Sequence, residues 1–224
     1  MRIKELRWLF IAVVAALVVR GFVGQPTNLG VSAEWINDRY RFAGGTAPWA
    51  LAFALLVSGL YLLLMYASPA VQRQPLPGVF RRFVAFWLDF ILAMMVVAPI
   101  LGILPALTEW RRTGVFEWNF QRTTPAHGDW LLATIGVALC FVALLFYYAL
   151  PLIRLRPSPG TCIVGYQVLP DEGTTLSLRT ALLRTLLGFV AVAAAYIAPF
   201  VSRDRTKGKF WLDKVFGTHA VRLG

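Results

Sequence analysis

Residues 80–104 read FRRFVAFWLDFILAMMVVAPILGIL, and this stretch decides the class of fold. After Arg81 and Arg82 at its start, it is apolar except for one acid, Asp89. An α-helix needs about 20 predominantly apolar residues to cross the hydrocarbon core of a bilayer. The stretch therefore predicts a membrane-spanning helix that carries one carboxylate inside it.

Three further stretches have the same apolar character, at residues 8–23, 48–67 and 130–153. The chain of 224 residues is 58% hydrophobic and 15% charged, with a mean hydropathy of +0.64. Soluble proteins are about 45–50% apolar and about 25% charged. We therefore expect an all-α membrane protein with four transmembrane helices and no separate soluble catalytic domain. The first helix follows a basic start, as in a signal peptide, but no small-residue cleavage site follows it, so we expect it to stay uncleaved.

The segments between and after these helices are polar. Residues 25–46 are expected to form a loop, and residues 105–128 an interfacial loop in which aromatic side chains alternate with charges. Residues 161–169, TCIVGYQVL, favour a strand, and the turn signal PDEG that follows predicts a small cytoplasmic β-hairpin with residues 174–178 as its return strand. Residues 178–201 are apolar but interrupted, so we expect a re-entrant or interfacial helical hairpin there. The interrupting residues are Arg179, Arg184, Gly188 and Pro199.

The distribution of lysine and arginine predicts the topology. If residues 178–201 do not cross the membrane, one side carries 16 of the 22 basic residues, and the other two loops carry 5. If they cross, the counts become 10 and 11, and the excess of positive charge that marks cytoplasmic loops disappears. We therefore expect both termini in the cytoplasm, with residues 218–223 free to lie beside the strand at 163–169.

The net charge of +11 has a second possible meaning, because basic chains often bind nucleic acid. No predicted helix carries a polar basic face, so the charge is better explained by cytoplasmic loops. Cys140 lies in an apolar run and Cys162 near polar sequence, so no disulfide is expected. The spacing of cysteine and histidine suits no zinc site, and we expect neither a metal nor a cofactor.

Asp89 is the one acid inside a predicted membrane helix, where an ionised carboxylate costs about 2.5–3.5 kcal/mol. Arg82 lies two turns earlier on the same helical face, and Arg184 begins the interrupted apolar segment. Asp89 is either a proton- or ion-binding carboxylate or part of a buried Arg–Asp network that fixes helix register. A transporter usually needs a more polar pathway, so the sequence favours the network.

Asp213 lies in the segment FWLDKVFGT at residues 210–218. We expect it to anchor a final short helix or to pair with arginines, although a solvated surface acid is also consistent with this sequence. The basic residues around it are expected to contact anionic lipid headgroups, at about 1 kcal/mol each. They are Arg203, Arg205, Lys207, Lys209 and Lys214.

Three blocks of the sequence resemble the RDD family of membrane proteins. Arg82, Ala85 and Asp89 resemble its opening signature RxxAxxxD. The middle block is similar at residues 158–160 (SPG), 165–168 (GYQV) and 176–184, and the closing block at Leu212-Asp213 and Gly217-Thr218. The chain departs from the family at Thr161, where a basic residue is usual, and at Leu212, where histidine is common. The resemblance implies that the arginine and two aspartates of the family name are Arg82, Asp89 and Asp213.

The resemblance also limits the expected functions. The family consists mostly of bacterial inner-membrane proteins; some have been proposed as cation/proton antiporters, and a eukaryotic relative is an accessory subunit of a membrane quality-control complex. We expect a two-helix extension at residues 1–76 and an RDD-like domain at 77–224. We predict a non-enzymatic accessory or scaffold subunit that partners other integral membrane proteins, held by a polar network of Arg82, Asp89, Asp213 and Arg184. The alternative is a small monovalent cation/proton antiporter that uses Asp89.

Overall fold

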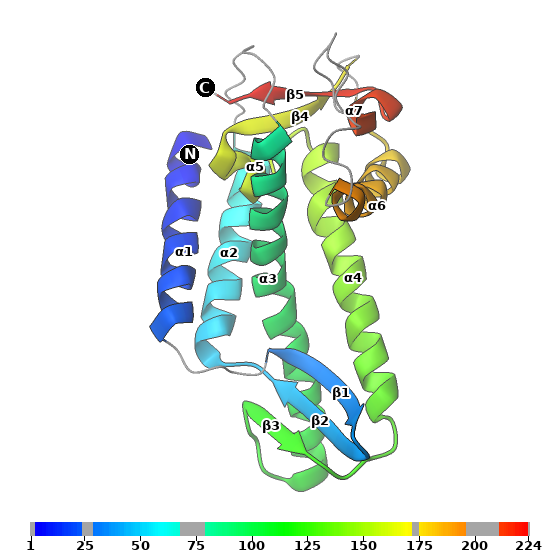
Figure 1. Ribbon diagram of the computed structural model, residues 1–224. Coiled ribbons are helices and arrows are strands. Elements are labelled where there is room, and N and C mark those ends of the chain that lie inside the picture. Colours follow the sequence, from blue (N-terminus) through cyan, green and yellow to red (C-terminus); the bar gives the residue numbers. More distant parts are fainter. Residues whose placement is uncertain (1–2, 24–28, 68–78, 172–174, 196–210, 224) are drawn as a thin grey trace. The chain divides into compact units, whose positions relative to one another are not determined.

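The computed structural model describes residues 3–23, 29–67, 79–171, 175–195 and 211–223 of the chain (Figure 1). Contacts between residues divide the chain into two compact units, which are described one at a time. The first unit consists of Met1–Val14, Leu60–Leu92 and Leu145–Gly224. The second consists of Ala15–Gly59 and Ala93–Leu144.

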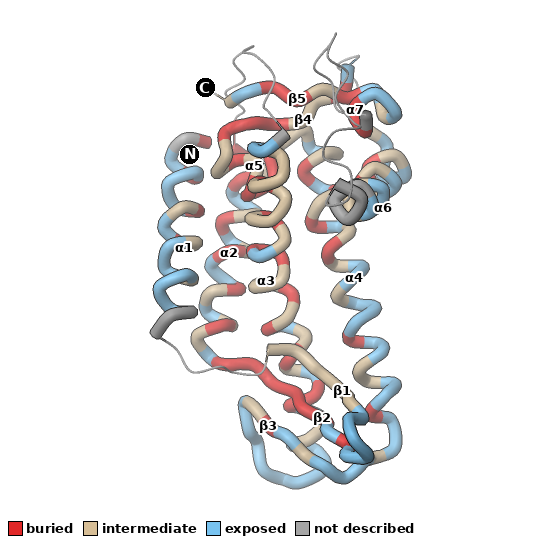
Figure 2. Tube along the Cα trace, viewed as in Figure 1, coloured by how far each residue is buried: buried red, intermediate tan, exposed pale blue. Residues whose placement is uncertain are grey.

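The structure is mostly helical. Its long helices are α1 (Ile3–Val23), α2 (Pro48–Tyr66), α3 (Val79–Thr113), α4 (Asp129–Ile153) and α6 (Leu178–Ala195). Within the described residues, α2, α3 and α4 are long and apolar enough to cross a membrane. Only 17% of the most apolar part of α4 is buried, and Figure 2 shows much of this helix exposed. Large apolar side chains on such a helix are stable when they face lipid, so the chain is a membrane protein.

Helix α3 is longer than the sequence predicted. The prediction ended it at residue 104, before Pro105, but the helix continues to Thr113. Its last turns are polar, and Glu109 forms an i,i+3 ion pair with Arg112. Gly114 ends the helix: its φ is +75°, and its backbone amide donates to the Trp110 carbonyl at 2.8 Å. A left-handed glycine is the usual terminator of a helix, so Gly114 rather than Pro105 decides where α3 stops.

The first unit contains a two-stranded antiparallel sheet formed by β4 (Tyr166–Pro170) and β5 (Thr218–Arg222). The predicted return strand at 174–178 is wrong, because residues 175–177 form no strand and α6 begins at Leu178. The alternative pairing with residues 218–223 is confirmed. The start of the predicted strand is also wrong: residues 159–164 form the short helix α5 (Pro159–Val164).

Local signals explain why α5 is helical despite its strand-favouring residues. The Ser158 side chain caps its start, Pro159 occupies the first turn, and Gly165 ends it in the left-handed conformation with φ of 85°. A serine cap followed by proline is a helix start signal. The sheet then packs on α3, where Ala85, Tyr166 and Ala220 form a buried cluster. The short helix α7 (Trp211–Val215) leads into β5.

The second unit contains a three-stranded antiparallel sheet where the sequence predicted only loops. Its strands, in spatial order, are β1 (Gly30–Ile36), β2 (Arg39–Gly45) and β3 (Asn119–Arg122). Asn37 and Asp38 join β1 to β2 with φ of 49° and 59°, as a two-residue hairpin turn requires. The strand β3 joins from far along the chain, and such a pairing leaves no local signal in the sequence.

This sheet lies directly against α3. A Cβ atom added to Gly102 of α3 would lie 2.8 Å from the carbonyl carbon of Gly45 and closer still to its oxygen. On the sheet, Tyr40, Phe42 and Phe120 form a buried cluster. Glycine at position 102 therefore allows backbone-to-backbone contact between helix and strand.

Candidate functional site

Asp213 is the centre of an ion-pair cluster in the first unit. Its side chain is completely buried. Arg82 Nη1 donates to Asp213 Oδ2 at 2.5 Å, and Arg184 Nη2 donates to Oδ1 at 2.7 Å. The Thr218 hydroxyl donates to the same Oδ1 at 3.2 Å. One carboxylate therefore joins the start of α3, helix α6, helix α7 and strand β5.

The electrostatics of this cluster depend on its low exposure to water. Both arginine side chains are 14% exposed, and Asp213 is 0% exposed. Charge-assisted hydrogen bonds in such surroundings are stronger than on a surface. Arg184 is held a second time, because its Nε donates to Thr218 Oγ1 at 3.3 Å. The cluster thus has a defined geometry as well as a favourable charge balance around Asp213.

Asp89 lies in a separate cluster of the same unit and is 2% exposed. The Ser158 hydroxyl donates to its Oδ2 at 2.5 Å, the Gly160 amide to its Oδ1 at 2.7 Å, and the Tyr147 hydroxyl to Oδ1 at 3.3 Å. Ser158 and Gly160 belong to the start of α5, where free backbone amides favour a negative charge. Asp89 therefore ties α3 to the first turn of α5 and to α4.

Tyr147, the donor from α4, is held in place by its neighbour Tyr61 on α2. The Tyr61 hydroxyl donates to the Tyr147 carbonyl oxygen at 2.8 Å, and the two rings stack with centroids 4.9 Å apart. On the next residue, the Tyr148 hydroxyl donates to the Phe86 carbonyl at 3.1 Å. Two tyrosine hydroxyls of α4 thus bind the part of α3 that carries Asp89, and a tyrosine of α2 supports one of them.

The structure divides the four predicted network residues between two clusters. Arg82 and Arg184 both bind Asp213, whereas Asp89 accepts hydrogen bonds from uncharged groups. Arg82 and Asp89 remain on one helix, about 10 Å apart along its axis. The polar interactions thus connect different segments of the chain to α3 at two positions along the helix, Arg82 and Asp89.

Sequence reasoning placed Arg82, Arg184 and Asp213 in one network, but it missed Thr218 and the described hydrogen-bond donors to Asp89. The Ser158-Pro159 pair is a recognisable helix start and was a usable signal for one of them. No such signal marks Tyr147, which lies within an apolar helix, or Thr218, which begins a short strand.

The expected lipid-contacting cations fall mostly in the undescribed part of the chain. Arg203, Arg205, Lys207 and Lys209 lie outside the described residues, and Lys214 is exposed on α7. Within the described residues there is no group of three histidine, cysteine, aspartate or glutamate side chains that could hold a metal.

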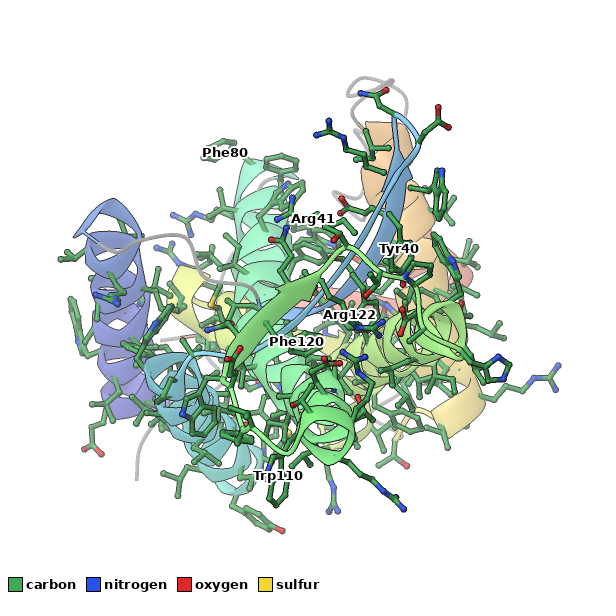
Figure 3. All side chains as sticks on the ribbon, turned by 90° about the horizontal axis from the view of Figure 1, so that it is seen from below. Tyr40, Arg41, Phe80, Trp110, Phe120 and Arg122 are labelled. Carbon is green, nitrogen blue, oxygen red and sulfur yellow. The ribbon has the colours of Figure 1, made fainter. Side chains whose placement is uncertain are left out.

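The second unit has its own polar cluster, around Asp129 at the start of α4. Asp129 accepts hydrogen bonds from the Tyr40 hydroxyl, from Arg122 and, at 2.9 Å, from the Ala126 amide. The Arg122 guanidinium lies over the Phe42 ring, 4.7 Å from its centroid. Figure 3 shows Arg122 on β3 close to Tyr40 on β2. The cluster joins two strands of the sheet to α4.

Tyr40 gives this cluster a testable pH dependence. Burial, together with the hydrogen bond to Asp129, raises the pKa of Tyr40 to about 12, from an ordinary value of about 10. Below pH 10 the Tyr40 hydroxyl is protonated in both the folded and the unfolded chain. Between about pH 10 and 12 it loses its proton only in the unfolded chain, so the free energy of unfolding falls as pH rises. We expect the wild-type protein to lose more unfolding free energy across this window than Tyr40→Phe, as measured by denaturant titration in detergent. Equal losses in the two proteins would contradict the assignment.

Comparison with known proteins gives one match. The sequence matches the model of the RDD family over residues 76–217, which includes Arg82, Asp89, Arg184 and Asp213. No curated protein matches the chain. No solved structure matches it either.

Proposed function

This chain belongs to the RDD family, and we propose that it is a non-enzymatic accessory or scaffold subunit of a membrane protein complex. The observation that carries the proposal is the engagement of both buried aspartates in contacts between separate segments. Asp213 is held by Arg82 and Arg184, and Asp89 by the start of α5 and by Tyr147. Such contacts favour one fixed arrangement of helices, which is what a docking subunit needs.

The topology belongs to the same proposal. Four helices, α1 to α4, would span a bacterial inner membrane, and the segment after α4 would form an interfacial hairpin with the β4–β5 sheet in the cytoplasm. The apolar character of α2, α3 and α4 and the charge bias of the loops support this arrangement. A cysteine added after Gly224 should then resist an impermeant thiol reagent in intact spheroplasts and react after lysis. Labelling in intact spheroplasts would contradict the topology.

Partner recovery tests the scaffold role directly. We expect an affinity-tagged chain, expressed from its own promoter and purified in mild detergent, to bring down other integral membrane proteins in fixed proportion. Asp213→Asn should lose them, because the arrangement of α3, α6 and α7 that presents the docking surface depends on this carboxylate. Purification of the wild-type chain alone, after cross-linking in the membrane, would contradict a scaffold role.

A monovalent cation/proton antiporter is the second candidate, and one observation favours it. Asp89 is buried within the apolar helix α3, and the hydrogen bonds described for it come from uncharged groups. No ion pair joins this carboxylate to a cation within the described residues, and such a carboxylate is able to exchange a proton for a cation. The hydrogen bonds from Ser158, Gly160 and Tyr147 argue against this role, because each weakens when a proton binds the carboxylate.

The variant Asp89→Asn separates the two functions. Under the scaffold proposal, wild-type proteoliposomes show no cation-dependent proton flux with a pH-sensitive dye. The variant then changes stability instead, by about 1–3 kcal/mol, because an amide replaces an acceptor of charge-assisted hydrogen bonds. Glu117→Gln, at an exposed acid of the second unit, is the matched control and should leave both readouts unchanged. Cation-dependent flux in the wild type that Asp89→Asn abolishes without loss of fold would establish the antiporter instead.

A further inference from the structure

Helix α6 directs Arg184 and Thr185 toward the protein and exposes a stripe of apolar side chains on another face. Arg184 binds Asp213, and the buried Thr185 donates its hydroxyl to the Ala181 carbonyl at 2.9 Å. The opposite side of the helix carries apolar residues at the spacing i, i+3, i+4, i+7, which places them on one stripe. The α6 stripe consists of Leu183, Leu186, Leu187 and Val190, whose exposed fractions are 44%, 41%, 37% and 59%.

This polarity is the reverse of that found on a helix facing water. A surface helix of a soluble domain buries its apolar face and exposes its charges. On α6 the ionic partner of Arg184 lies inside the unit, and the exposed stripe has no polar side chain. The surroundings of the α6 stripe are therefore apolar.

The inner contacts of α6 place it against two helices that are apolar enough to cross a membrane. Phe189 contacts the rings of Phe86 on α3 and Tyr148 on α4, with centroids 5.6 and 5.3 Å apart. Both partners lie near an end of a helix that is apolar enough to cross the membrane. The adjoining turns of α6 are thus at the shallow edge of the hydrocarbon. In Figure 1, α6 lies beside the upper turns of α4 and runs at an angle to that helix.

One charged residue stands at the end of the stripe. Arg179 is exposed in the first turn of α6, one helical turn before Leu183. A guanidinium at the edge of an apolar face can reach the phosphate of a lipid whose acyl chains cover that face.

We propose that α6 lies in the plane of the membrane, with the α6 stripe in the acyl chains of one leaflet and Arg179 on the phosphate of an anionic phospholipid. The inference rests on the topology proposed above, in which the chain after α4 does not cross. It adds a lipid-binding site on α6, the helix whose Arg184 also belongs to the ion-pair cluster at Asp213.

Spin labels on the stripe test the placement. Cysteine is introduced at Leu183, Leu187 or Val190 in a Cys140→Ala background; Cys162 stays, because burial raises the pKa of its thiol to about 12. The background protein without an added cysteine checks that Cys162 takes up no label. The labelled proteins are placed in vesicles of phosphatidylethanolamine and phosphatidylglycerol, and collisions with oxygen and with a water-soluble nickel chelate are measured.

The expected result is that oxygen collides more often than the nickel chelate at all three sites, with similar immersion depths. A label at the exposed Arg222 is the control and should favour the nickel chelate. Depth that increases by about 1.5 Å per residue would mean a spanning helix, and preference for the nickel chelate would mean water. Exclusion of both reagents would mean a protein partner. Each of these results overturns the proposal, whereas the cysteine after Gly224 tests the topology independently.

Lipid retention tests the role of Arg179. Arg179→Gln is expected to retain about fivefold less phosphatidylglycerol through purification, relative to phosphatidylethanolamine. The control is Arg154→Gln, at an exposed arginine just after α4, which should retain the wild-type amount. Equal loss in both variants, or no loss in either, would overturn the assignment of the headgroup to Arg179.

Discussion

Asp213→Asn is expected to lower the free energy of unfolding by about 3–5 kcal/mol. The substitution keeps the size of the side chain but removes the negative charge that faces Arg82 and Arg184. Two guanidinium groups that are each 14% exposed then lose their described ionic partner, and water cannot fully replace it. The measurement is unfolding of the purified protein in detergent micelles, followed by tryptophan fluorescence.

Two further variants identify the cause of this loss. Glu117→Gln removes a charge from an exposed site and should change stability by less than about 1 kcal/mol. Adding Arg184→Met to Asp213→Asn should recover part of the loss, because one unpaired cation is removed. A loss of less than about 1 kcal/mol for Asp213→Asn alone would contradict the central position of this carboxylate.

Gly160→Ala is the second substitution with a large expected effect, about 3 kcal/mol or more. Its new Cβ would lie 2.8 Å from Asp89 Cγ and closer still to the Ala85 carbonyl oxygen. The obstruction is the backbone of α3, which cannot rotate away, so α5 must move. That movement also breaks the hydrogen bond from the Gly160 amide to Asp89.

Gly188→Ala in α6 is the matched control, because nothing lies within 4 Å of its added Cβ. It should be neutral or stabilising by about 0.5–1 kcal/mol, since alanine favours a helix. Thermal unfolding in the same detergent measures both variants. Equal stability of Gly160→Ala and Gly188→Ala would show that α5 does not pack closely on α3.

The sequence predicted the membrane helices well and the small sheets poorly. Helices at 48–67, 80–104 and 130–153 follow from a local property, the scarcity of charge over about 20 residues. The sheet in the second unit was missed because two long apolar helices, α2 and α3, separate β2 from β3 in the sequence, and the short alternation in each strand is a weak signal. In the first unit, the strand at 166–170 was predicted, but the predicted return strand at 174–178 was wrong, and β5 is its partner.

The candidate site shows the same division. Asp89 was singled out as the one acid inside a predicted membrane helix, and Asp213 by its place in the segment FWLDKVFGT and by the family resemblance. Local reasoning could not divide the predicted network into its actual pairs: Arg82 lies two turns from Asp89 on the same helix, yet it binds Asp213, 131 residues away. The helical spacing places Arg82 and Asp89 on one face, but it does not determine which partner the long arginine side chain contacts.

Hydropathy and charge are summed along the chain, so the amino-acid sequence is enough to establish a helical membrane protein with a net charge of +11. The ion pairs and hydrogen bonds depend on which segments meet after folding, and only the tertiary structure determines that. Asp213 reaches Arg82 and Arg184 because α7 and β5 return to the start of α3. Asp89 meets the start of α5 because Gly160 has no side chain to keep the two backbones apart.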